Sequence, residues 1–206
     1  FNWINTIVAG FLDFSRQGAM LVFGQLAIPP GQTGPGGEPS LGFFLAFQAM
    51  PTVIFVSSLM AGLYYIGLMP LILRIFSWVF TRALRLSGAE SLCTASNIFV
   101  GIESVFTIRP YIRRMTPSEL HMILTAAMST IASSVLGLYV LTLRDVFPEI
   151  AGHLVSASLL SAPAAVVMAK LLLPETERPL TFGQVVEPEK LPASTFVEAL
   201  LTGASE

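Results

Sequence analysis

The chain has 206 residues, of which 53% are hydrophobic and 12% are charged. Ordinary soluble domains carry roughly 25% charged residues, so this composition predicts a membrane protein. The formal net charge of −2, with no basic run between aromatic residues, excludes nucleic acid as a partner. The single cysteine and two separated histidines likewise exclude an intramolecular disulfide and a cysteine–histidine metal site.

The first 40 residues are expected to form a helix followed by a loop. Trp3, Ile7 and Phe11 recur at helical spacing, while Asp13 and Arg16 make the middle of this segment too polar to cross a membrane. An amphipathic helix lying in the membrane interface is one interpretation, and a helix packed along other membrane helices of a longer chain is the other. Residues 28–40 are rich in proline and glycine, which predicts a loop.

Three later segments are apolar enough to cross a membrane. A spanning helix needs about 20 predominantly apolar residues, and residues 43–69, 118–143 and 152–173 meet that requirement. Each of them is bounded by charged residues or proline. Residues 39–73 and 120–143 contain no Asp, Glu, Lys or Arg at all. We therefore predict three transmembrane helices.

The arginines indicate how these spans are oriented. Lys and Arg in short loops mark the cytoplasmic face of a membrane protein. Three arginines follow the first span and three precede the second, so both clusters are expected on that face: Arg74, Arg82, Arg85, Arg109, Arg113 and Arg114. The segment between them, residues 75–108, then starts and ends on one side of the membrane. It is predicted to form a re-entrant hairpin with Gly101 at its tip, because glycine permits close approach of a ligand to the backbone.

The predicted fold class is an all-α membrane protein with an interfacial amphipathic helix, three transmembrane helices and one re-entrant hairpin. Residues 1–40 form the interfacial helix and its loop, and residues 41–174 form the membrane region with the hairpin at about 75–108. Residues 175–206 form a polar linker and the start of a further helix.

Two acidic residues in the predicted hairpin require partners. Glu90 is expected to pair with Arg82 or Arg85 near the cytoplasmic face. An ionised carboxylate at membrane depth costs several kcal/mol, so Glu103 is expected either to bind substrate or a proton or to pair with Arg109 or a neighbouring helix.

Several short motifs resemble those of the concentrative nucleoside transporter family. The sequence Asn97-Ile-Phe-Val-Gly101 with Glu103, Arg109-Pro110-Tyr111 and Met115-Thr116 resembles the family's first re-entrant hairpin and the helix that follows it. Residues 47–69, 89–91 and 161–179 are similar to the same family in the same order. The resemblance implies an all-helical homotrimer in the lipid bilayer, here the bacterial inner membrane, that couples sodium entry to nucleoside uptake. This chain would supply the first hairpin and half of the pocket.

The resemblance also implies which residues bind the coupling ion and the substrate. No cofactor is expected apart from sodium as the coupling ion, which would be held by Asn97, Val100, Thr130 and Ile131. These residues supply an amide, a hydroxyl and backbone carbonyls, and oxygen is the ligand that a hard cation requires. Helix–helix hydrogen bonding is the alternative role for Asn97 and Thr130.

The nucleoside would contact Ile102, Glu103, Ser104 and Val135. The family has Gln-Thr-Glu after the tip glycine, and here the amide is replaced by apolar Ile102, so the base that is preferred can differ. Alternatives to a sodium-coupled symporter are a proton-coupled transporter of a related polar solute and a membrane gate or scaffold that does not transport. The motifs G-x-S-x-G and H-E-x-x-H are absent, so the chain is not expected to be an enzyme.

Overall fold

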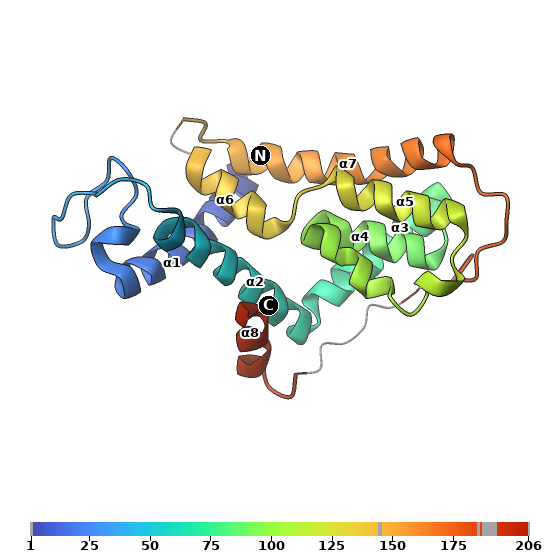
Figure 1. Cartoon of the computed structure of the whole chain (residues 1–206), viewed down its shortest axis with the longest axis horizontal. Coiled ribbons are helices and arrows are strands. Elements are labelled where there is room, and N and C mark those ends of the chain that lie inside the picture. The colour runs from blue at the N-terminus through green and yellow to red at the C-terminus, as the bar shows by residue number, and fades with distance from the viewer. Residues whose placement is uncertain (1, 144–145, 185, 187–192, 206) are drawn as a thin grey trace. The chain divides into compact units, whose positions relative to one another are not determined.

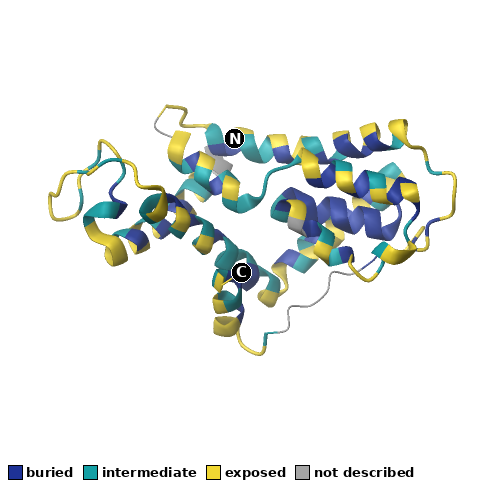
Figure 2. Ribbon diagram, viewed as in Figure 1, coloured by how far each residue is buried: buried dark blue, intermediate teal, exposed yellow. Residues whose placement is uncertain are grey.

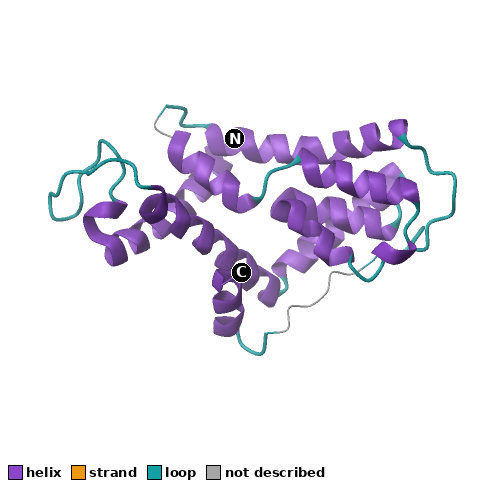
Figure 3. Cartoon of the chain, in the orientation of Figure 1, coloured by secondary structure: helices purple, strands orange, loops and turns teal. Residues whose placement is uncertain are grey.

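The computed structural model describes residues 2–143, 146–184, 186 and 193–205, without the side chains of residues 2–5 and 103. Every named element within this part of the chain is a helix (Figure 3). Three helical segments there are long and apolar enough to cross a membrane, Leu45–Ile66, Pro117–Leu143 and Ile150–Leu172. The prediction of an all-α protein with three spans at these places is confirmed.

The N-terminal helix α1 covers Asn2–Phe23 and continues as a short 3-10 helix, Gly24–Ala27. Residues 28–44 contain no helix, as their proline and glycine content favours. The amide of Gln48 donates hydrogen bonds to the carbonyls of Leu26, Ile28 and Gly42, at 2.8 to 3.1 Å. The loop is thereby fastened to the start of the first span. A position of α1 in the membrane interface stays a prediction.

The chain divides into two compact units. Unit 1 comprises Phe1–Gly62, Ser134–Leu154 and Val197–Glu206, and unit 2 comprises Leu63–Ser133 and Val155–Phe196. In Figure 1, α3, α4 and α5 of unit 2 lie side by side.

Unit 1 has a small apolar core built from four helices. Leu12 of α1, Val56 of α2 (Met50–Ile66), Val140 of α6 (Ser133–Leu143) and Ala151 of α7 (Ile150–Leu172) form its buried cluster. The burial of such apolar surface is what holds these helices together.

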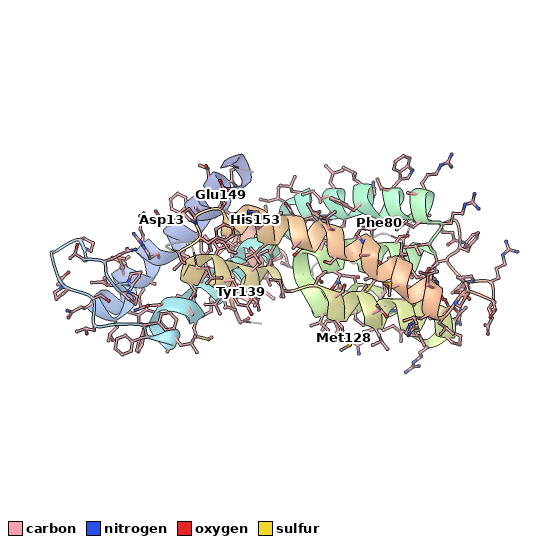
Figure 4. All side chains as sticks on the ribbon, turned by 90° about the horizontal axis from the view of Figure 1, so that it is seen from above. Asp13, Phe80, Met128, Tyr139, Glu149 and His153 are labelled. Carbon is pink, nitrogen blue, oxygen red and sulfur yellow. The ribbon has the colours of Figure 1, made fainter. Side chains whose placement is uncertain are left out.

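Two further contacts within unit 1 involve the start of α7 and the packing of the last helix. Glu149 and His153, labelled in Figure 4, form an i,i+4 pair at 4.0 Å at the start of α7. Helix α8 (Phe196–Ser205) packs closely on α2, where Ser58 donates a hydrogen bond to the carbonyl of Leu200 at 2.9 Å. A side chain at Gly203 would collide with Ala61, so glycine is needed for this close packing.

Near the start of unit 2 the chain bends at Gly67, which has a φ of 86° and precedes α3 (Leu68–Leu84). Met69, Leu73, Ser77 and Phe80 of α3 are buried at helical spacing. This buried face continues past residue 75, where the sequence predicts the start of the hairpin. Helix α3 therefore runs on without a break to Leu84. The chain turns only at Arg85, which takes a left-handed conformation with a φ of 54°.

The next three elements are α4 (Gly88–Val100), the 3-10 helix η3 (Gly101–Ile108) and α5 (Pro117–Ser129). Helix α4 is buried from Gly88 to Ile98 and is the most enclosed element of unit 2 (Figure 2). The chain turns at Gly101, and η3 packs back against α4. The second predicted span is interrupted between Ser129 and Ser133, which separates α5 from α6.

Candidate cation and substrate site

Helices α4 and α5 begin in the same way. Each starts with a capping box, in which a hydroxyl residue caps the helix and a glutamate three residues later bonds back to the cap. The pairs are Ser87 with Glu90 and Thr116 with Glu119. These local sequence signals explain why both helices begin where they do.

Hydrogen bonds along α4 and α5 show that the two helices run parallel. Near the middle, Thr94 donates to the sulfur of Met122 at 3.6 Å, and further on the amide of Asn97 donates to the carbonyl of Ala126 at 2.5 Å. Residue numbers rise together along both helices. Their N-terminal ends therefore lie together, and so do their C-terminal ends.

The C-terminal ends of α4 and α5 bring backbone carbonyls to one place. The Asn97 carbonyl accepts from the N–H of Gly101 and from the hydroxyl of Thr130 at 3.2 Å, and Ser129 donates to the Ala126 carbonyl at 2.8 Å. The C-terminal end of a helix carries a partial negative charge of about half an electron. Two such ends together favour a cation.

Gly101 joins the hairpin tip to the break between α5 and α6. Its backbone has a φ of 76° and a ψ of −143°, a conformation available essentially only to glycine. A Cβ at this position would lie 2.9 Å from both the nitrogen and the Cα of Ala132. Glycine is therefore required on two independent grounds.

The four predicted sodium ligands lie around this junction. Asn97 is fully buried one turn before the tip, and Val100 is the last residue of α4. Thr130 and Ile131 lie in the break, directly before the Ala132 backbone that contacts Gly101. The structure thus brings together residues from two separate parts of the sequence. Their binding of sodium stays a prediction.

The predicted nucleoside contacts differ from one another in how far they are exposed. Ser104 is 0% exposed, and its hydroxyl lies 3.4 Å from the Asn97 side-chain oxygen and 3.6 Å from the Cys93 sulfur. Ile102, in contrast, is 65% exposed on η3. Val135 belongs to α6 in unit 1 and is partly exposed. The side chain of Glu103 lies outside the described part of the structure, as does its expected pairing with Arg109.

The expected pairing of Glu90 with Arg82 or Arg85 is wrong. Glu90 is 1% exposed, and its partner is Lys170 of α7, whose ammonium lies 2.5 Å from Glu90 Oε1. The two arginines are exposed, whereas Glu90 lies on a fully buried part of α4. A signal for the pair exists in the sequence, because Lys170 is the one Lys or Arg in the third predicted span and a charge in such a segment needs a partner.

Comparisons with known proteins agree with this architecture. Residues 46–145 match a protein family described as "Gate: Nucleoside recognition". Solute carrier family 28 member 3 of Homo sapiens is 40% identical over 207 residues, covering 100% of this chain and 27% of that protein. Sodium/nucleoside cotransporter 1 of Mus musculus is 33% identical over 215 residues, with 100% and 29% covered. An uncharacterized transporter of Haemophilus influenzae is 35% identical over 205 residues, with 97% and 45% covered.

Solved structures give the same result. The transporter CNTnw in an inward-facing, substrate-bound state has a TM-score of 0.78 and 34% identity, over 98% of this chain and 45% of that one. A CNTnw variant in an outward-facing state has a TM-score of 0.80, with 34% identity over 98% and 46%. These relatives are named as transporters and not as enzymes, and the chain covers less than half the length of each. In sequence and in fold, this chain belongs to the concentrative nucleoside transporter family.

Proposed function

We propose that this chain is part of a sodium-coupled nucleoside symporter. It contributes the first re-entrant hairpin and half of the substrate and sodium site. The observation that carries the proposal is the junction at which the C-terminal ends of two parallel helices meet Gly101 and the break after α5. Broken helices whose ends converge on one place are a recurring way to hold ions and substrates in membrane transporters.

The chemistry at the junction suits a small monovalent cation. Sodium would take the side-chain oxygens of Asn97 and Thr130 and the carbonyls of Val100 and Ile131. The Thr130 hydroxyl directs its proton at the Asn97 carbonyl, which leaves its lone pairs for a cation. The negative ends of α4 and α5 add to the attraction without placing an ionised acid among the ligands.

The nucleoside would bind against the segment that follows the tip. Ile102 presents an exposed apolar side chain to a base. Glu103 and Val135 are further proposed contacts, which the family resemblance implies. Ser104 bonds to Asn97 at 3.4 Å, so the substrate segment and a sodium ligand share a hydrogen bond. Binding of either partner would order the other, which provides a physical route to coupling.

The protein resides in a lipid bilayer, the bacterial inner membrane, and assembles as a homotrimer. The three apolar spans and the similarity to a Haemophilus influenzae transporter support the location. The trimer is supported by the family resemblance.

Uptake into proteoliposomes tests the function. The transporter that contains this chain would be reconstituted and supplied with radiolabelled uridine, adenosine or pseudouridine, with sodium or with choline outside. We expect uptake of at least one nucleoside in sodium and little in choline. Uptake driven in choline by an inward proton gradient would establish the proton-coupled alternative. No uptake under either condition would favour a gate or scaffold that does not transport.

A further inference from the structure

A buried polar network lies at the other end of the α4–α5 pair, where both helices begin. At its centre is the ammonium of Lys170, from the last turn of α7. We call the group the Lys170 network. Its members are Lys170, Glu90, Glu119, Glu175, Ser87, Thr116 and Ser118.

Lys170 reaches three elements at once. Its Nζ lies 2.5 Å from Glu90 Oε1 on α4, donates to Ser118 Oγ on α5 at 3.0 Å, and lies 3.6 Å from Glu175 Oε2 in the segment after α7. The side chain of Glu90 is almost completely buried, so loss of this cation would leave an uncompensated charge inside unit 2.

The two capping boxes are also bonded directly to each other. Glu90 accepts from the Ser87 N–H at 2.9 Å, and Glu119 accepts from the Thr116 N–H at 2.9 Å. The Ser87 hydroxyl, which caps α4, donates to Glu119 of α5 at 2.5 Å. The first turns of α4 and α5 are thereby bonded directly as well as through Lys170.

The segment after α7 completes the attachment of α4. The backbone N–H of Gly88 donates to the Thr181 carbonyl at 2.9 Å, and the N–H of Ala89 donates to the Thr181 hydroxyl at 3.0 Å. A side chain at Gly88 would collide with the carbonyl of Gln184. The start of α4 therefore has little freedom to slide relative to α5 and α7.

We propose that Lys170 is a positioning residue for the cation site at the opposite end of α4 and α5. Each helix has 13 residues and is about 20 Å long, and a helix is stiff along its axis. A shift at the network is therefore transmitted to the C-terminal ends, where Asn97, Thr130 and Gly101 meet. Lys170 itself does not touch the ion.

This inference rests on the proposed function, and its signature is a selective loss of sodium affinity. In Lys170→Met, we expect the sodium concentration for half-maximal uptake to rise about tenfold, the low end for loss of a group that orients metal ligands. The nucleoside KM at saturating sodium should change by less than about twofold, because the substrate contacts themselves remain. Lys170→Arg retains the charge and should recover sodium affinity to within about threefold of wild type.

One control variant and one milder variant complete the test. Arg178→Met removes an exposed positive charge from the same part of the chain and should leave sodium affinity unchanged. Ser118→Ala removes the hydroxyl that accepts from Lys170 and donates to the Leu173 carbonyl at 2.8 Å, while keeping every charge. It should raise the half-saturating sodium concentration by about threefold. This milder variant decides the matter if Lys170→Met fails to fold.

Sodium binding is measured separately, as the rise in unfolding temperature of the purified transporter when sodium is added. A wild-type protein without any sodium response would overturn the proposed function and this inference with it. A wild-type response that Lys170→Met and Ser118→Ala reproduce at the same sodium concentrations would overturn the inference alone. Equal losses in sodium affinity and nucleoside KM would also contradict it, because they would indicate general damage to the fold.

Discussion

Gly101 shows how a single residue determines the geometry of the candidate site. Its φ of 76° is unfavourable for residues with a Cβ, and Ala132 leaves no room for one. Gly31 has nearly the same backbone angle, with a φ of 77°, but no atoms lie within 4 Å of its Cβ position. The two glycines therefore share a positive φ and differ in whether neighbouring backbone leaves room for a Cβ.

We expect Gly101→Ala to lose much more stability and function than Gly31→Ala. A positive φ costs an alanine about 1–3 kcal/mol, and the ψ of −143° at Gly101 lies outside the left-handed helical region as well. At Gly101 the contact with the Ala132 backbone adds to this, because backbone cannot move aside as a side chain can. Thermal unfolding and sodium-dependent uptake of the two variants test this. Equal behaviour of the variants would contradict the close approach at the hairpin tip.

At the scale of elements, the parallel arrangement of α4 and α5 determines the charge distribution of unit 2. Two aligned helix dipoles place positive ends together at one side and negative ends at the other. Glu90 and Glu119 compensate the positive ends from within the chain. A bound cation would compensate the negative ends in the same way.

Loss of either side-chain oxygen at the negative ends should therefore weaken sodium binding. For Asn97→Ala and Thr130→Ala we expect the half-saturating sodium concentration to rise about tenfold or more, equivalent to about 1.4 kcal/mol, the scale of one polar contact. Thr125→Ala is the matched control, because that hydroxyl bonds back to the His121 carbonyl within α5. Sodium titrations of nucleoside uptake measure the effect. Wild-type sodium affinity in both variants would remove Asn97 and Thr130 from the site.

At the scale of the whole molecule, the predicted hairpin determines on which side of the membrane each connection lies. The three apolar helical segments agree with the sequence, and the arginines before and after the predicted hairpin predict that its two ends lie on the same side. Arg82 and Arg113 are both exposed, and Val146 in the connection before α7 is 86% exposed. These positions can report the topology.

Cysteines placed at these positions, in a Cys93→Ala background, should label from different sides. A membrane-impermeant maleimide is expected to react with Arg82→Cys and Arg113→Cys from the cytoplasmic side and with Val146→Cys from the opposite side. The reason is that a re-entrant hairpin returns to its starting face, whereas a spanning helix does not. Labelling of Arg82→Cys and Arg113→Cys from opposite sides would contradict the hairpin.

The sequence alone was sufficient for the properties that depend on local composition. The three spans follow from runs of apolar residues, and the starts of α4 and α5 follow from their capping boxes, because both are decided by neighbours within one or two turns. The family resemblance further predicts that Asn97 and Thr130 belong to one site, although they are 33 residues apart in the chain.

Only the tertiary structure decided which distant groups meet. The arginines near Glu90 in the sequence point to a local partner, but burial of α4 turns its carboxylate toward Lys170 on α7. Ser104 and Ile102 are two residues apart, yet one is enclosed beside Asn97 and the other is exposed. Hydropathy and motif spacing act along the chain, whereas the parallel pairing of α4 with α5 and the partner of a buried charge depend on packing between segments that the sequence does not place side by side.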